Sequence, residues 1–325
     1  MLPIACAAPA GAMQLDAPIC RDAPPQHAIS HGNGIIELDW QDTVCLEHAD
    51  RAVRMARLAE RLGLPDRPIV TQYLLDRRLL PPAFRGDVPL LRIVFPERSF
   101  FDTARSEIRP EALDALRLIA ESLRREVPDV AVFVAGHTDD RGGEDYNHNL
   151  SVARANAVAA ELDTIGVGGV ALWRVGFGEA VPLRANNSPE NMAVNRRVEF
   201  IIGARAEAVA TWLARQQPDL CTERGDSGRC LRRPVARREF VAEPVTTRFG
   251  LAAPVAPSRG VSLRSTRGHA PSPDSGGRSV AAVVGAERRV GAPQRTRIAL
   301  APARAPHIRI SLREANIRVE APQPF

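Results

Sequence analysis

The fold is decided by the stretch Val130-Ala-Val-Phe-Val-Ala-Gly-His-Thr-Asp139-Asp-Arg-Gly-Gly-Glu-Asp-Tyr-Asn147-His-Asn-Leu150-Ser-Val-Ala-Arg154. Its first six residues form a continuous apolar run, which is typical of a buried strand. A polar loop follows from Gly136 to Asn149, and apolar residues then recur at helical spacing until Gly166 ends the helix. A buried strand that leads into an amphipathic helix predicts that the helix packs on that strand's own sheet.

Strand and helix signals continue on both sides of this stretch. Residues 90–95 and 171–175 are strand-like, and residues 198–202 form a further apolar run. Between the first two runs, Pro110 suits a first helical turn, and the helical pattern that follows it stops at Pro128. The sequence therefore predicts an α+β domain over residues 88–202, a β-α-β-α-β-β sandwich with helices packed on one face of a mixed sheet.

The rest of the chain divides by composition into four regions. Residues 1–12 are apolar and end in Ala-Gly-Ala, as in the back half of a truncated signal peptide. Residues 13–87 form a small N-terminal accessory region, in which the pattern predicts a helix over 48–62 and a short helix over 73–80. Residues 203–230 are expected to form a C-terminal helix and a cysteine loop, and residues 231–325 a disordered tail rich in Arg, Pro and Ala.

The positive charge belongs to the tail. All 43 basic residues are arginine, and the formal net charge is +5. Residues 231–325 hold 17 arginines against 6 acidic residues, a net of +11, so the rest of the chain is acidic. One alternative function is therefore binding of nucleic acid or an anionic surface by the tail. Few aromatic residues lie among these arginines, which are scattered among Pro and Ala, so we expect no nucleic acid partner.

Two further features concern the cellular compartment. Once residues 1–12 are removed, the even number of cysteines predicts the disulfides Cys20–Cys45 and Cys221–Cys230, while free thiols in a reducing compartment remain the alternative. No apolar stretch reaches the roughly 18 to 20 residues of a membrane-spanning helix. We therefore expect an exported protein without a transmembrane segment.

Charged side chains of opposite sign meet near the end of the 130–135 strand. Asp139 follows this strand, and Arg154 lies at the border of the helix's apolar stripe. Asn195, Arg196 and Arg197 precede the last strand and add a second cationic edge. A carboxylate beside guanidinium groups suits a zwitterionic ligand, whose ammonium would contact Asp139 and whose carboxylate would contact Arg154.

Several spaced motifs together resemble the OmpA-like peptidoglycan-binding domain family. They are Phe100-Phe-Asp-Thr, Gly136-His-Thr-Asp139, Tyr146-Asn-His-Asn-Leu-Ser-Val-Ala-Arg-Ala155, Gly176-Phe-Gly-Glu179 and Asn195-Arg-Arg-Val-Glu-Phe200. The resemblance implies non-catalytic binding of the diaminopimelate of the peptidoglycan stem peptide, through Asp139 and Arg154 with Thr138, Asn147, Leu150 and Arg196. One departure is Ala104, where some relatives carry an asparagine that contacts the ligand.

The resemblance also implies a periplasmic location, at the cell wall or outer membrane, and an envelope protein partner for residues 13–87. The main alternative is a metal-dependent hydrolase that uses His137, Asp139 and His148 in the polar loop. The loop lacks the spacing of a known zinc motif, and no serine or cysteine has a matched base. We therefore expect no enzyme activity, no metal and no cofactor.

Overall fold

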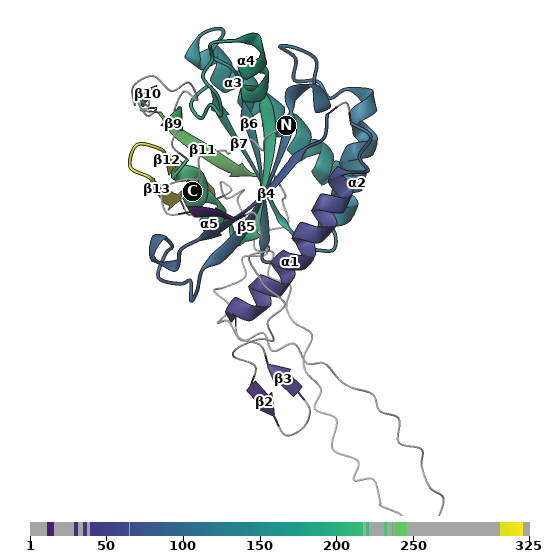
Figure 1. Ribbon diagram of the computed structural model, residues 1–325, viewed down its shortest axis with the longest axis vertical. Coiled ribbons are helices and arrows are strands. Elements are labelled where there is room, and N and C mark those ends of the chain that lie inside the picture. The colour runs from purple at the N-terminus through teal and green to yellow at the C-terminus, as the bar shows by residue number, and fades with distance from the viewer. Residues whose placement is uncertain are drawn as a thin grey trace, which may run out of the picture.

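The computed structural model describes residues 12–15, 29–31, 35–37, 40–64, 66–216, 219–220, 231–232, 236, 238–245 and 306–320. In this part of the chain, a nine-stranded mixed sheet runs in the order β1-β4-β5-β8-β6-β7-β11-β12-β13 (Figure 1). Its strands are β1 (Ala12–Leu15), β4 (Ile69–Leu75), β5 (Val88–Pro96), β6 (Val130–His137), β7 (Ala171–Gly178), β8 (Arg197–Ala204), β11 (Glu239–Pro244), β12 (His307–Ser311) and β13 (Asn316–Glu320). Two short pairs, β2 (Ile29–His31) with β3 (Ile35–Glu37) and β9 (Asp219–Leu220) with β10 (Leu231–Arg232), lie outside it.

Helix α3 (Glu144–Ile165) connects β6 to β7, the parallel pair of the sheet. The other pairs within the sheet are antiparallel. A parallel connection needs a crossover segment, and α3 supplies it while covering the two strands it joins. The predicted α+β class, with helices on a mixed sheet, is confirmed.

Side chains alternate between the two faces of the sheet, and each face is buried. Along β6, Val132 and Val134 belong to one core cluster, while Phe133 and Ala135 belong to the other. The first cluster is covered by α1 (Trp40–Ala59), α2 (Leu113–Leu123) and α3. The second is covered by α5 (Ala206–Ala214) with β12 and β13 (Figure 1). Helix α5, which follows the span over which helices were expected on one face, thus covers the opposite face of the sheet.

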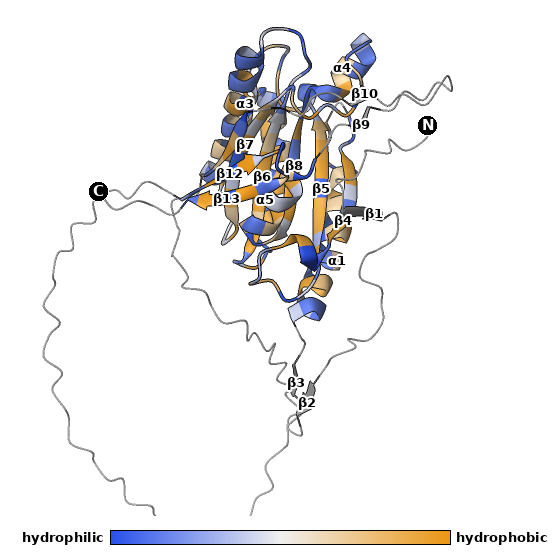
Figure 2. Ribbon diagram, turned by 90° about the vertical axis from the view of Figure 1, so that its left-hand side faces the viewer, coloured by the Kyte–Doolittle hydropathy of each residue, from blue (hydrophilic) through white to orange (hydrophobic). Residues whose placement is uncertain are grey.

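Both faces are covered because the central strands are apolar on both sides. All of the residues in β6 and β8 are buried, as are eight of the nine in β5. Figure 2 shows this concentration of apolar residues in the central strands. A strand that is apolar on both faces loses stability unless a layer covers each face. None of the helices in the described part of the chain is long and apolar enough to cross a bilayer.

Residues 40–75 belong to the same sheet and core as the domain that follows. Strand β4 pairs with β5 over seven residues, so the expected boundary between residues 87 and 88 falls inside the sheet. The helix predicted over 73–80 is wrong for residues 73–75, because Tyr73 and Leu75 complete β4 with their side chains fully buried. Only a short 3-10 helix, Arg77–Leu79, lies in the predicted range. The helix predicted over 48–62 is present, but it begins earlier, at Trp40.

The C-terminal region contributes three strands to the sheet. Phe240 and Ala242 of β11, and Ile308 and Ile310 of β12, are buried in the same core cluster as α5. The expectation of disorder over 231–325 is therefore wrong for residues 239–244 and 307–320. These residues form strands because their apolar residues recur with a period of two, which buries one side of each strand in the core. Residues 1–11, Cys20, Cys221, Cys230 and residues 246–305 lie outside the described residues, so the export signal, the disulfides and most of the tail stay predictions.

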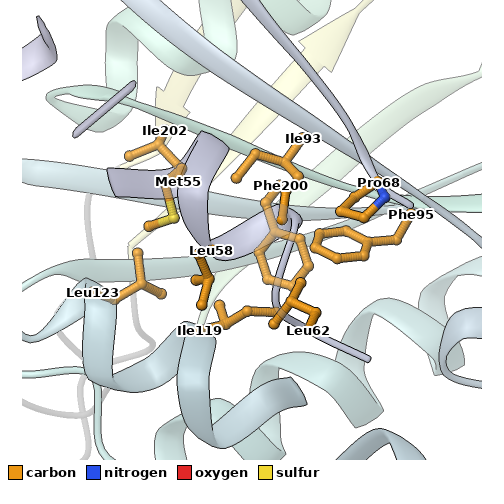
Figure 3. A pocket seen from close by; sticks show the side chains of 11 residues that line it. Met55, Leu58, Leu62, Pro68, Ile93, Phe95, Ile119, Leu123, Phe200 and Ile202 are labelled. Atoms are coloured by element: carbon orange, nitrogen blue, oxygen red, sulfur yellow. The ribbon is translucent and has the colours of Figure 1, made fainter. Parts of the chain in front are cut away.

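A small apolar hollow lies between α1, α2 and the sheet (Figure 3). It is lined by Met55, Leu58, Ala59, Leu62, Pro68, Ile93, Phe95, Ile119, Leu123, Phe200 and Ile202. Ligand sites combine an apolar lining with a few convergent polar groups, and these side chains offer none. We interpret the hollow as an imperfection of core packing.

Helix α1 is attached to the domain by buried polar contacts. Nε2 of His48 lies 3.0 Å from Oε1 of Gln72 on β4, and Nε of Arg51 donates to Oε2 of Glu126 at 2.9 Å. Burial, helped by the charge of Arg51 and opposed by the hydrogen bond with Gln72, lowers the pKa of His48 to about 4. His48 is therefore neutral in the folded protein at neutral pH.

This burial predicts acid sensitivity. As the pH falls below about 6.5, the unfolded chain protonates His48 while the folded chain does not, so stability present above pH 6.5 is lost progressively down to about pH 4. At pH 5 the wild type should have lost about 2 kcal/mol of unfolding free energy through His48, and the substitution His48→Gln should remove this loss. Urea denaturation of both proteins between pH 5 and 8 measures this; identical pH profiles would contradict it.

The C-terminal strands predict a second effect on stability. Truncating Ile310 on β12, which is fully buried, should lower the unfolding free energy by about 3 kcal/mol in Ile310→Ala. The neighbouring Arg309 is 37% exposed and pairs with Glu320, so Arg309→Ala should cost less than about 1 kcal/mol. Equally small losses in denaturant titrations would mean that β12 is not part of the folded core.

Candidate functional site

The strand register brings three chain segments to one end of the sheet. Arg197 of β8 lies opposite Pro96 at the end of β5 and opposite His137 at the end of β6. The residues just beyond these strand ends are Glu97, Thr138 and Arg196. Asp139 follows Thr138, and α3 begins a few residues later. Side chains from distant parts of the sequence therefore converge on this edge.

A chain of ion pairs links the residues at this edge. Nη1 of Arg196 donates to Oδ2 of Asp139 at 2.7 Å, and Nε of Arg196 donates to Oε2 of Glu97 at 2.6 Å. Nη2 of Arg154 donates to the other oxygen of Glu97. Asp139 and Arg154 thus lie in one site, but Arg196 and Glu97 stand between them and complete an alternating row of charges.

Burial and pairing oppose each other at three members of this row, Asp139, Arg154 and Arg196. Burial alone would raise the pKa of Asp139, but hydrogen bonds from Arg141 and Arg196 hold it below its ordinary value. Burial lowers the pKa of Arg154, and Glu97 opposes that shift. The pKa of Arg196 is raised, because its bonds to Asp139 and Glu97 outweigh burial. Asp139 and Arg196 are therefore held in their charged forms by the ion pair between them.

Arg154 is built into the core more deeply than its place at the border of the helix stripe indicated. Its side chain is 1% exposed, and its Nε donates to the backbone carbonyl of Arg105 at 2.8 Å. Its guanidinium also lies 5.5 Å from the ring of Phe101. Nη1 of Arg154 is the guanidinium nitrogen that donates to none of the described residues.

Of the two arginines predicted to form a second cationic edge, the structure brings Arg196 to Asp139 and places Arg197 away from it. Consecutive strand residues point to opposite sides, so Arg196 faces Asp139 while Arg197 is buried on the α5 side. There, Nε of Arg197 donates to Oε1 of Glu199 at 2.6 Å and Nη2 donates to the carbonyl of Val181 at 2.9 Å.

Asn195 organises a loop. Its side-chain oxygen accepts from the backbone N–H groups of Leu183 and Arg184, and its Nδ2 donates to the carbonyl of Arg184 and to Oδ1 of Asn186. Both amide hydrogens are used, so Asn195 has a structural role in place of the predicted ligand contact. It closes the loop that leads into α4 (Pro189–Asn195), a helix that the sequence pattern did not predict.

The other predicted site residues are Thr138, Asn147 and Leu150. The hydroxyl of Thr138 is buried without a hydrogen-bond partner among the described residues. Nδ2 of Asn147, on the first turn of α3, donates to Oε2 of Glu179 at 2.6 Å. Leu150 lies one turn further along α3 and is half-buried. Thr138 is therefore the predicted site residue whose buried polar atom is left unsatisfied within the described part of the chain.

The metal-dependent alternative is not supported. His137 lies beside Glu199 on the α5 side, whereas Asp139 pairs with Arg141 and Arg196. His148 packs against the ring of Phe240. Among the described residues, no group of three or more His, Cys, Asp or Glu side chains could hold a metal ion.

Glu97 and Arg141 contact the predicted residues directly, yet the sequence pattern did not single them out. Glu97 accepts from both arginines of the site, and Arg141 donates two guanidinium hydrogen bonds to Asp139. A signal was available for Glu97, because two partly buried arginines require a carboxylate nearby. Arg141 lies in the polar loop, where nothing in the sequence indicated which way its side chain would turn.

A second buried ion cluster lies behind the site, on the α5 side of the sheet. Glu199 accepts from Nε of Arg92 at 2.7 Å and also from Arg197. Burial alone would raise the pKa of Glu199, but the charges of Arg92 and Arg197 outweigh burial and lower it. Burial and the charge of Arg197 lower the pKa of His137. The signal in the sequence was a charge inside an otherwise apolar strand run, at Arg92 and at Glu199.

This cluster predicts a large effect of an isosteric substitution. Glu199→Gln removes the negative charge between two buried guanidiniums and should lower the unfolding free energy by about 3 to 5 kcal/mol. Glu243→Gln removes a half-exposed partner of Arg174 and should cost less than about 1 kcal/mol. Denaturant titration compares the two, and similar losses would mean that Glu199 does not neutralise the cluster.

Comparison with known proteins gives matches over the same part of the chain. The OmpA family model matches residues 100–196. The probable lipoprotein YiaD of Escherichia coli is 38% identical over 117 residues, which are 36% of this chain and 52% of that protein. Outer membrane protein A of Bordetella avium is 35% identical over 115 residues, 35% of this chain and 59% of that protein.

Two more relatives extend the comparison. The peptidoglycan-binding protein ArfA of Mycobacterium tuberculosis is 36% identical over 102 residues, 31% of each chain. Among solved structures, the cell wall anchor of the T6SS from Pseudomonas aeruginosa is 31% identical, with a TM-score of 0.30, and covers 37% of this chain and 85% of that one. The matches span 31 to 59% of the three curated relatives. The chain therefore carries a domain of the OmpA family, whose matched residues run from the turn after β5 to the residue before β8.

Proposed function

We propose that this domain binds peptidoglycan without catalysis, by holding the diaminopimelate of the stem peptide. The observation that carries the proposal is the row of charges from Asp139 through Arg196 and Glu97 to Arg154. The free end of diaminopimelate carries an ammonium and a carboxylate on one carbon. Asp139 would accept from the ammonium, and Arg154 would donate to the carboxylate.

The site offers groups that suit each end of this ligand. The carboxylate of Asp139 is fixed in place by Arg196 and stays ionised, as an ammonium ligand requires. Arg154 keeps Nη1 for a carboxylate while Glu97 and the Arg105 carbonyl hold its other nitrogens. A preorganised guanidinium loses little freedom on binding, which favours affinity.

The names of the relatives support a role in the cell envelope. One is called a peptidoglycan-binding protein, and others are called an outer membrane protein and a probable lipoprotein. We infer a periplasmic location at the cell wall or outer membrane, where the domain anchors the protein or a partner. Helix α1, within the region expected to contact an envelope partner, exposes Leu46 and Val53.

The test is sedimentation of the full-length protein with purified sacculi, comparing the wild type with Asp139→Asn. The substitution keeps the shape of the side chain but removes the charge that would hold the ammonium, so affinity should fall about 10- to 100-fold. Asp114→Asn on α2, where the carboxylate is exposed, is the matched control and should bind like the wild type. Thermal unfolding verifies that each variant is folded.

A second arm tests the ligand itself. Sacculi whose stem peptide carries lysine in place of diaminopimelate lack the carboxylate that Arg154 would bind, so they should retain much less protein. Arg154→Ala is a poor test, because it leaves Glu97 buried without its partner and should destabilise the fold. A wild-type protein that fails to sediment with either wall, or an Asp139→Asn variant that binds unchanged, would refute the proposal.

A further inference from the structure

One carboxylate oxygen of Asp139, Oδ2, is saturated by the protein's own donors. Its Oδ2 accepts from Nη1 of Arg196 at 2.7 Å and from Nη2 and Nε of Arg141 at 2.8 and 3.0 Å. Its Oδ1 accepts from the backbone N–H of Arg141 at 3.1 Å. A carboxylate oxygen accepts about two good hydrogen bonds, so Oδ2 has no place for a further cation. A ligand ammonium can reach this oxygen only by replacing one of the two guanidiniums.

The two guanidiniums differ in how firmly they are held. Arg196 is also bonded to Glu97, and its side chain is 21% exposed. Arg141 is 59% exposed, and its guanidinium contacts only the carboxylate of Asp139 among the described residues. Releasing Arg196 would leave Glu97 with one of its two cations, whereas releasing Arg141 returns an exposed cation to water. Arg141 is therefore the group that a ligand would displace.

We propose that Arg141 occupies the ammonium position on Asp139 in the free protein, and that its displacement by the ligand sets the affinity of the site. This inference rests on the proposed function, because it concerns the same ligand. Arg141 is an internal competitor: its fork-shaped guanidinium satisfies the buried carboxylate until an ammonium arrives. The backbone N–H of Arg141 keeps its bond to Oδ1 in either state, so only the side chain has to move.

The competition has a modest size and a definite sign. A half-exposed ion pair is worth up to about 1 kcal/mol, which corresponds to about fivefold in affinity. Removing the guanidinium in Arg141→Gln should therefore tighten binding of meso-diaminopimelate about three- to fivefold. Arg141→Lys keeps the charge but loses the fork, so its affinity should lie between the two.

The experiment is isothermal titration of the full-length protein with meso-diaminopimelate, for the wild type, Arg141→Gln, Arg141→Lys and Arg117→Gln. Arg117 is an exposed arginine on α2 that pairs with Asp114, so its substitution changes the net charge equally. Its affinity should equal that of the wild type. If Arg117→Gln tightens binding as much as Arg141→Gln, the effect is one of net charge and the inference is wrong.

The remaining outcomes separate this inference from the proposed function. If the wild type binds and Arg141→Gln binds equally or more weakly, Arg141 does not compete and only this inference fails. If no variant binds, the proposed function fails and the inference with it. If Arg141→Gln binds meso-diaminopimelate and the wild type gives no measurable binding heat, the result would support competition by Arg141.

Discussion

The carboxylate of Glu97 is the contact on which the binding edge depends. It accepts from Arg154 on one oxygen and from Arg196 on the other, and its own backbone N–H donates to the carbonyl of Arg196. Two guanidiniums that are largely removed from water would repel each other without an anion between them. Glu97 therefore joins the end of β5, helix α3 and the segment before β8 into one rigid edge.

A buried carboxylate also stands between two guanidiniums on the α5 side of the sheet, where Glu199 accepts from Arg92 and Arg197. Arg196 and Arg197 are adjacent in sequence, yet strand alternation sends one toward Glu97 and Asp139 and the other toward Glu199. Each arginine meets a buried carboxylate on its own side. The pair thus connects the charge network at the end of the sheet to one that lies inside the core beneath α5.

The layer beneath α5 depends on segments far from the family domain. Strands β11, β12 and β13 extend the sheet beyond β7 and pack with α5 over a face that would otherwise expose apolar residues of β6 and β7. Arg238, just before β11, also pairs with Glu144 and Asp145 on the first turn of α3. The C-terminal strands therefore complete the core and contact the helix that carries Asn147 and Arg154.

The sequence by itself determined the four central strands, the helices that follow two of them, and the placement of Asp139 at a strand end, because apolar periodicity is a local property. Spaced motifs also identified the family and Arg154. The tertiary structure alone decided which side each neighbouring arginine faces, that Asn195 serves a loop, and that Glu97 and Arg141 complete the site. It also decided that β4, β11, β12 and β13 are strands of this sheet. These features depend on pairing between residues distant in sequence, and local periodicity carries no information about which distant segments will meet.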